Sequence, residues 1–116
     1  MTGADILIQC IKAQGIDTLV GMPGNQNIHL YEAVRQAGGI RHILIRNEQG
    51  ATLIANGYAR ASGKVGVALT VPGPGATNAA TGLVDAHTDN VPVLLTTGGT
   101  EVAFNGRDRS KCFHGL

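Results

Sequence analysis

Four short runs rich in branched apolar residues alternate with segments whose apolar residues recur at helical spacing. The runs have the length and composition of β-strands and lie at residues 17–21, 41–46, 65–71 and 91–97. The helical segments lie at residues 2–14, 28–37, 48–62 and from the 72–78 loop to residue 87. Because strand and helix alternate throughout, the sequence predicts a parallel sheet with helices on both faces. This is a three-layer α/β/α fold of the flavodoxin-like type.

The chain of 116 residues has no internal repeat, no low-complexity stretch and no linker. We therefore expect one domain over residues 1–116, with an irregular tail at residues 99–116 where no period is visible. Hydrophobic residues make up 43% of the chain and aromatic residues only 3%, so aliphatic side chains must build the core. The 17 glycines cluster at turns, which indicates close approach of the backbone to a ligand or to another backbone.

Charge and composition exclude several classes of function. A net charge of +1 without a basic run indicates no nucleic-acid partner and no acidic membrane surface. No apolar run reaches the length of a membrane span, and the two distant cysteines, Cys10 and Cys112, predict reduced thiols in a cytoplasmic protein. The four histidines lack ligand spacing, so no metal site is expected in this chain.

One carboxylate, Glu48, falls at the junction of a predicted strand and a predicted helix. Ile43, Leu44 and Ile45 predict the end of a buried strand, and small residues follow Glu48. Open α/β sheets place their ligand crevices at the carboxyl ends of strands. A purely structural alternative is that Asn47 caps the helix and Glu48 complements its dipole. This stretch alone leaves both interpretations open.

Three loops follow strands at the same predicted edge of the sheet: residues 22–27, residues 47–48 and residues 72–78. They can therefore line a single crevice. The third loop has glycines before a helix, as phosphate sites do, but it lacks the lysine of a P-loop. Its two prolines also remove amide donors. A stiff apolar shelf against a flat ring suits this loop better, with a rigid helix entry that binds no ligand as the alternative.

Two helices have informative faces. The helix at residues 2–14 places Leu7, Cys10 and Ile11 at helical spacing, which predicts that Cys10 lies on the apolar face. The helix after Glu48 carries a ridge of small residues, Ala51, Ala55, Ala59 and Ser62. Such a ridge allows close approach of the sheet or of a partner subunit. We expect packing inside the domain.

Four ordered motifs together resemble a known family. They are GMPG at residues 21–24, RNEQGA at 46–51, GYAR at 57–60 and GPGATN at 73–78. In this combination they resemble the N-terminal pyrimidine-binding domain of thiamine-diphosphate enzymes, in the group of acetolactate synthase, benzaldehyde lyase and the 2-oxo acid decarboxylases. The resemblance covers residues 2–98.

The resemblance implies a role for each motif. Glu48 corresponds to the glutamate that hydrogen-bonds a ring nitrogen of the cofactor's aminopyrimidine and so activates thiamine diphosphate. Gly24, Pro74 and Asn78 correspond to positions that contact the cofactor. The chain is then expected to serve a lyase or transferase, a carboligase or a decarboxylase, that acts on a 2-oxo acid or an aldehyde.

Asn25 and Gln26 follow the GMPG motif and are candidates for contact with the substrate, since a relative carries a catalytic histidine near this position. Acetolactate synthases carry a glutamine where this chain has Gly99, a departure that argues against acetolactate synthesis itself. Asn47 also differs from the resembled family, in which a histidine frequently precedes the glutamate.

The resemblance further implies parts that these 116 residues do not contain. The family domain continues with two more strands, and a separate domain binds Mg²⁺ and the diphosphate; FAD, where used, binds outside this part as well. We therefore expect the complete enzyme to be a homo-oligomer, a dimer or a tetramer, and this chain alone to be inactive. A function of another class stays open: a non-catalytic flavodoxin-like module that binds a nucleotide or a partner chain.

Overall fold

The computed structural model describes residues 1–99, and the irregular tail predicted from residue 99 lies outside the described residues from position 100 onward. The four strands are β1 (Thr18–Gly21), β2 (Arg41–Leu44), β3 (Gly66–Thr70) and β4 (Val93–Thr97). The four α-helices are α1 (Gly3–Ala13), α2 (Ile28–Ala37), α3 (Glu48–Ser62) and α4 (Pro74–Thr88). A short 3₁₀ turn, η1 (Asn25–Asn27), precedes α2.

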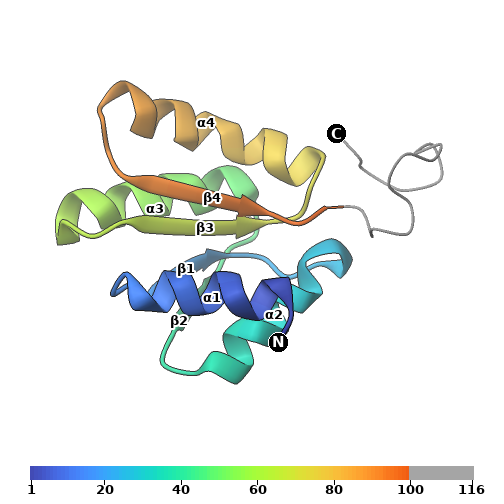
Figure 1. Ribbon diagram of the computed structural model, residues 1–116. Helices are drawn as coiled ribbons and strands as arrows, with labels where there is room; N and C mark the ends of the chain where they lie inside the picture. The colour runs from blue at the N-terminus through green and yellow to red at the C-terminus, as the bar shows by residue number, and fades with distance from the viewer. Residues whose placement is uncertain (100–116) are drawn as a thin grey trace.

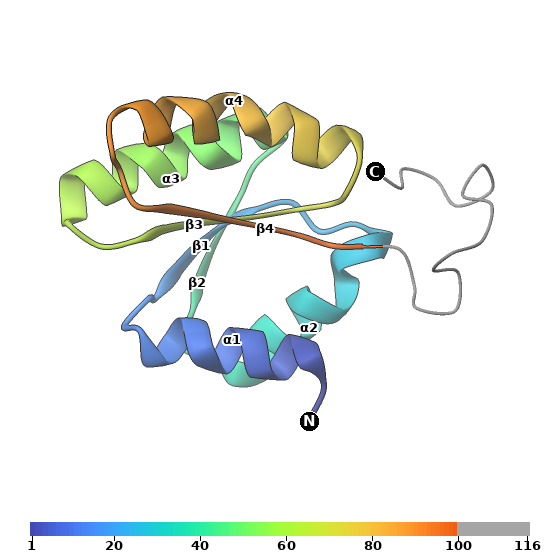
Figure 2. The same cartoon turned by 45° about the horizontal axis from the view of Figure 1, so that its top comes forward.

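The strands form one parallel sheet in the order β2-β1-β3-β4. Helices α1 and α2 cover one face of this sheet, and α3 and α4 cover the other (Figures 1 and 2). The predicted three-layer α/β/α fold with a parallel sheet is therefore confirmed. No helix within residues 1–99 combines the length and apolar character needed to cross a membrane.

The helix ends follow from local sequence. Thr2 caps α1: its hydroxyl accepts a bond from the Asp5 amide at 3.2 Å, while the Asp5 carboxylate accepts one from the Thr2 amide at 2.6 Å. Asn47 caps α3 by accepting a hydrogen bond from the amide of Gln49 at 2.9 Å, as the structural alternative for this stretch expected. These caps satisfy amides that have no partner inside the helix.

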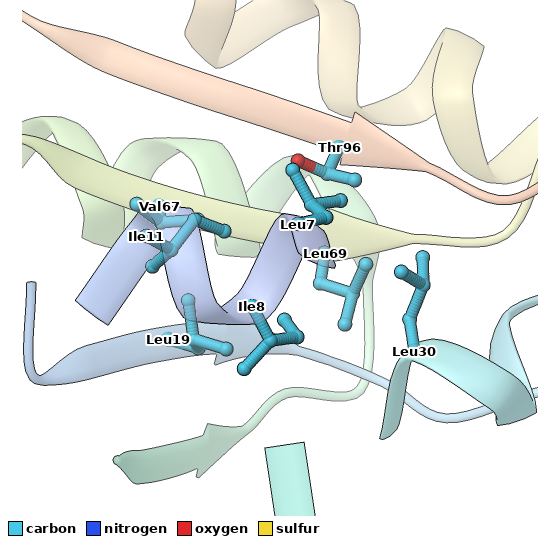
Figure 3. Close-up of a pocket in the computed structure, with 8 residues that line it drawn as sticks. All are labelled: Leu7, Ile8, Ile11, Leu19, Leu30, Val67, Leu69 and Thr96. Atoms are coloured by element: carbon cyan, nitrogen blue, oxygen red, sulfur yellow. The ribbon is translucent and has the colours of Figure 1, made fainter. Parts of the chain in front are cut away.

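The core has two parts, one on each face of the sheet. The part under α1 and α2 is built from Ile8, Ile11, Leu19, Val34 and Val67, and the part under α3 from Val20, Ile45, Ala51, Ala55 and Ala68. Figure 3 shows a small cavity between α1, α2 and the sheet. Aliphatic side chains line it apart from Thr96 of β4, so it has the character of core packing and not of a reactive site.

The small-residue ridge of α3 packs inside the domain, as expected, except for its last residue, Ser62, which is exposed. Ala51 and Ala55 have no exposed surface and Ala59 is 3% exposed. A Cβ added to Gly66 at the start of β3 would overlap the Ala55 carbonyl, so helix and strand are in backbone contact. The ridge therefore sets the distance between α3 and the sheet.

Three expectations about individual positions were wrong. Cys10 is exposed because the buried face of α1 is centred on Ile8 and Ile11, and Cys10 points away from both. Leu44 is 58% exposed because β2 is an edge strand. The 72–78 segment is not loop throughout, since α4 already begins at Pro74.

Candidate functional site

The topology marks one place along the carboxyl edge of the sheet. After β1 the chain turns outward to β2, and it returns through α3 to place β3 on the other side of β1. The connections that follow β1 and β3 therefore diverge to opposite faces of the sheet. Such a switch point is where open α/β sheets bind ligands. The motif residues gather around it.

Glu48 is the first residue of α3 and lies at this edge, 9% exposed. One oxygen of its carboxylate, Oε2, accepts a hydrogen bond from Nδ2 of Asn78 at 3.2 Å. Asn78 is neutral, and no cation forms an ion pair with Glu48 within the described residues. Burial disfavours an unpaired charge, and the positive end of the α3 dipole offsets part of that cost.

Gly75, in the first turn of α4, faces the same carboxylate. A Cβ added to Gly75 would lie 3.6 Å from Oε1 and from Cγ of Glu48, and 2.7 Å from a methyl group of Val71. A Cβ on Gly24 would lie 2.6 Å from the other Val71 methyl group. The Val71 side chain is therefore held between two bare stretches of backbone. Together they place an apolar surface beside Glu48.

The backbone at the start of α4 explains this placement. Gly73 adopts a positive φ of 65°, a conformation that side chains disfavour. Pro74 then occupies the first turn of the helix, where its fixed φ and missing amide are tolerated. A rigid entry to this helix, which both interpretations of the loop share, is thus present, and it carries Gly75 to Glu48.

Asn27, which sequence reasoning missed, holds the loop after β1. Its side chain is 1% exposed, accepts a hydrogen bond from the Gly24 amide at 2.7 Å and donates one to the Met22 carbonyl at 3.1 Å. An asparagine in a glycine-containing turn is a recognisable signal for such a contact. Beyond this turn, Gly98 packs directly against the Gln26 backbone, so the end of β4 adjoins the same loop.

The structure brings some of the predicted site residues together and not others. Glu48 and Asn78 are in direct contact, and Gly24 adjoins them through Val71. Pro74 and Asn25 are exposed at the same edge, and no side-chain hydrogen bond or ion pair joins either of them to Glu48 within residues 1–99. The edge therefore has a buried acceptor at its centre and solvent-facing polar and apolar groups around it.

Comparison with known proteins identifies the family. Residues 1–114 match the family described as thiamine pyrophosphate enzyme, N-terminal TPP binding domain. The chain belongs to this family. Thiamine pyrophosphate is thiamine diphosphate, so the resemblance in the four motifs is confirmed at the level of the family.

Individual proteins are similar over most of this chain. The acetolactate synthase large subunit of Lactococcus lactis is 47% identical over 92% of the chain. The acetolactate synthase isozyme 2 large subunit of Escherichia coli is 46% identical over 93% of the chain, and the acetolactate synthase large subunit of Haemophilus influenzae is 45% identical over 84%. The matches span 19%, 20% and 17% of these three relatives, so the chain corresponds to about a fifth of their length.

No group of three or more histidine, cysteine, aspartate or glutamate side chains within the described residues is arranged to hold a metal ion. Within residues 1–99, the carboxylates other than Glu48 have structural partners. Asp17 pairs with Lys64 at 2.9 Å, Glu32 with Arg35 at 2.7 Å and Asp89 with Arg60 at 2.5 Å. Glu48 differs from them in being buried beside a neutral amide.

Proposed function

We propose that this chain binds the aminopyrimidine of thiamine diphosphate for a lyase or transferase that acts on 2-oxo acids or aldehydes. The observation that carries the proposal is the surroundings of Glu48: a buried carboxylate that has no cationic partner among residues 1–99, at the switch point of the sheet, beside bare glycine backbone. Similarity to proteins named acetolactate synthase supports this class of enzyme.

The residues fit an aminopyrimidine ring. A flat heteroaromatic ring needs a hydrogen-bonding partner at its nitrogen and close apolar contact on its faces. Glu48 offers the acceptor, and the absence of a side chain on Gly75 keeps the Oε1 side of its carboxylate open. The Val71 methyl groups supply an apolar contact. Gly24, Pro74 and Asn78 would then border the ring.

Thiamine diphosphate, once bound, supplies a nucleophilic carbon that attacks carbonyl groups. In our proposal, the role of this chain is to hold the aminopyrimidine ring and to stabilise positive charge at one of its ring nitrogens. The Glu48 carboxylate accepts a hydrogen bond from the ring nitrogen and stabilises a proton there. Asn78 keeps the carboxylate in place through Oε2. Asn25 and Gln26, on the loop after β1, would contact the substrate.

The diphosphate and Mg²⁺ need groups other than these. Phosphate sites use amide donors and cations at a helix N-terminus, and here two prolines stand at the start of α4. We infer that another part of a longer, oligomeric protein holds the diphosphate and its metal. FAD, if used at all, would also bind outside this domain.

The test is the change Glu48→Gln in the complete gene product. Glutamine keeps the shape of the side chain but removes the charge that stabilises the ring proton. Turnover should fall by at least about a hundredfold, the scale of a positioned acid–base group. Exchange of the cofactor's thiazolium proton, followed by NMR, should slow in parallel.

Glu32→Gln is the matched control, because Glu32 is an exposed residue of α2 with the same chemistry. That variant should retain turnover and proton exchange. If Glu48→Gln exchanges the thiazolium proton at the normal rate, Glu48 serves only as the first residue of a helix. The non-catalytic binding module would then be the better description of the chain.

A further inference from the structure

Thr70, the last residue of β3, has a buried hydroxyl group without a partner. The residue has no exposed surface, and its Oγ1 makes no hydrogen bond within the part of the chain that the structure describes. By contrast, Thr52 is equally buried and donates to the carbonyl of Ala79 at 2.7 Å. Buried hydroxyl groups that stay unpaired are rare because losing water costs free energy. The hydroxyl of Thr70 therefore calls for an explanation.

The position of Thr70 along the sheet is level with Glu48. Side chains alternate along a strand, so Thr70 faces the same side as Ala68, the side covered by α3 and α4. Gly66 touches Ala55 of α3. From that contact, β3 advances about 13 Å to Thr70. In the same direction, α3 extends about 10 Å back to Glu48. Figure 1 shows α3 and α4 both starting above the arrowhead of β3.

Glu48 has the matching free acceptor. Its Oε2 accepts from Asn78, whereas no hydrogen bond reaches Oε1 among residues 1–99. Oε1 lies on the side of Gly75. A carboxylate oxygen accepts hydrogen bonds only, and a threonine hydroxyl donates one. An unpaired donor and an unpaired acceptor thus lie at the same level under the first turns of α3 and α4.

We propose that Thr70 is a positioning residue whose hydroxyl donates, through one buried water molecule, to the carboxylate of Glu48. A single buried water commonly links polar groups that would otherwise stay unpaired. Thr70 cannot touch a ligand, since it has no exposed surface, so it acts only by orienting Glu48. The functional consequence rests on the proposed role of Glu48, whereas the link itself is a property of the ligand-free chain.

The experiment compares Thr70→Val and Thr70→Ser in the ligand-free chain. Valine keeps the shape and removes the donor, so the equilibrium constant for folding should drop about tenfold in urea denaturation, the usual scale of one hydrogen bond. The ¹³C resonance of the Glu48 carboxyl carbon should move in Thr70→Val and stay at the wild-type position in Thr70→Ser. A crystal structure should show the water.

If the hydroxyl is simply unpaired, valine should stabilise the chain and leave the Glu48 resonance in place, and that result would overturn the proposal. Thr18→Val is the matched control, since Thr18 is a buried strand residue at the opposite edge of the sheet. It should leave the Glu48 resonance unchanged. If Thr70→Val does not fold, a crystal structure of the wild type without a water beside Thr70 decides against the link. Because no cofactor is used, failure here is separate from failure of the proposed function.

Discussion

Asp17 and Glu48 lie at opposite edges of the sheet and have opposite surroundings. Asp17 is exposed and accepts hydrogen bonds from Lys64 at 2.9 Å and from Tyr58 at 3.1 Å. Glu48 is buried and has one neutral partner. The exposed, paired carboxylate of Asp17 therefore connects α3 and the start of β3 to the start of β1. A buried carboxylate that accepts one direct hydrogen bond within residues 1–99 keeps further acceptor positions, which leaves room for a ligand as well as a water molecule.

Asp17 makes the free energy of unfolding depend on pH in the acid range. The hydrogen bond from Lys64, with those from Thr18 and Tyr58, lowers the pKa of Asp17 to about 2. Because the pKa of Asp17 in the folded chain lies below its unfolded value of about 4, the contribution of Asp17 to the free energy of unfolding is complete above pH 4. It is lost as the pH falls toward 2. The urea midpoint should therefore decline in this window.

The change Asp17→Asn should make that decline shallower, as measured by urea denaturation between pH 5 and pH 2. Some decline remains because Glu32, paired with Arg35, also has a pKa of about 2. Equal slopes in wild type and Asp17→Asn would show that this contact contributes nothing to folding.

The sequence predicts single site residues better than their contacts. The position of Glu48 follows from a strand run that gives way to small helical residues. Its bond to Asn78 depends on how α4 packs on α3, which no local pattern reveals. Thr70 was missed because a buried threonine looks the same in sequence as an exposed one. For Asn27 the glycine-containing turn was a signal of a side-chain contact, but such a turn does not indicate that the asparagine is buried.

At the scale of elements, the contact between α3 and α4 positions the candidate site. The Thr52 hydroxyl of α3 donates to the Ala79 carbonyl of α4 at 2.7 Å. Gly82, one turn further along α4, is buried against Thr52. This close approach fixes the two helix starts relative to each other, and with them Glu48 and Asn78.

Two glycine-to-alanine changes test this contact. A Cβ on Gly82 would lie 2.7 Å from the Leu53 amide nitrogen, so Gly82→Ala must push α3 and α4 apart. We expect a loss of about 2 kcal/mol in the free energy of unfolding, as for other overpacked cores. Gly57 lies in the same pair of helices but is exposed with open space around it. Gly57→Ala should gain about 0.5–1 kcal/mol through helix propensity.

Urea denaturation of both variants measures these opposite effects. If Gly82→Ala were as stable as wild type, the contact between the helices would be looser than described.

The number and order of the elements follow from the sequence because the strand runs are well separated. Their exact ends do not, since α4 begins inside a segment whose glycines and prolines also suit a loop.

At the scale of the whole molecule, the chain matches the N-terminal domain of its family and spans about a fifth of the length of its relatives. The parallel three-layer architecture was predictable from alternation alone. The exposure of Leu44 was not, because strand order, which makes β2 an edge, cannot be read from local patterns.

We predict that this chain by itself binds thiamine diphosphate no more tightly than millimolar. Only the aminopyrimidine, about nine heavy atoms, would find partners, and each atom contributes a fraction of a ceiling of about 1.5 kcal/mol. A millimolar dissociation constant already needs about 4 kcal/mol. Titration calorimetry with thiamine diphosphate and Mg²⁺ measures this, with Mg²⁺ alone as the control. Saturable micromolar binding would reveal a diphosphate site within these residues.

The pairing of β1 with β3 also has a consequence for the growing chain during synthesis. Val20 pairs with Ala68, so the central contact of the sheet joins segments separated by α2, β2 and α3. Contacts between residues distant in sequence must wait until the intervening residues are available. A nascent chain that ends after β2 and the first turn of α3 already contains Glu48, in water. That side chain becomes a buried acceptor only after β3 and α4 have left the ribosome.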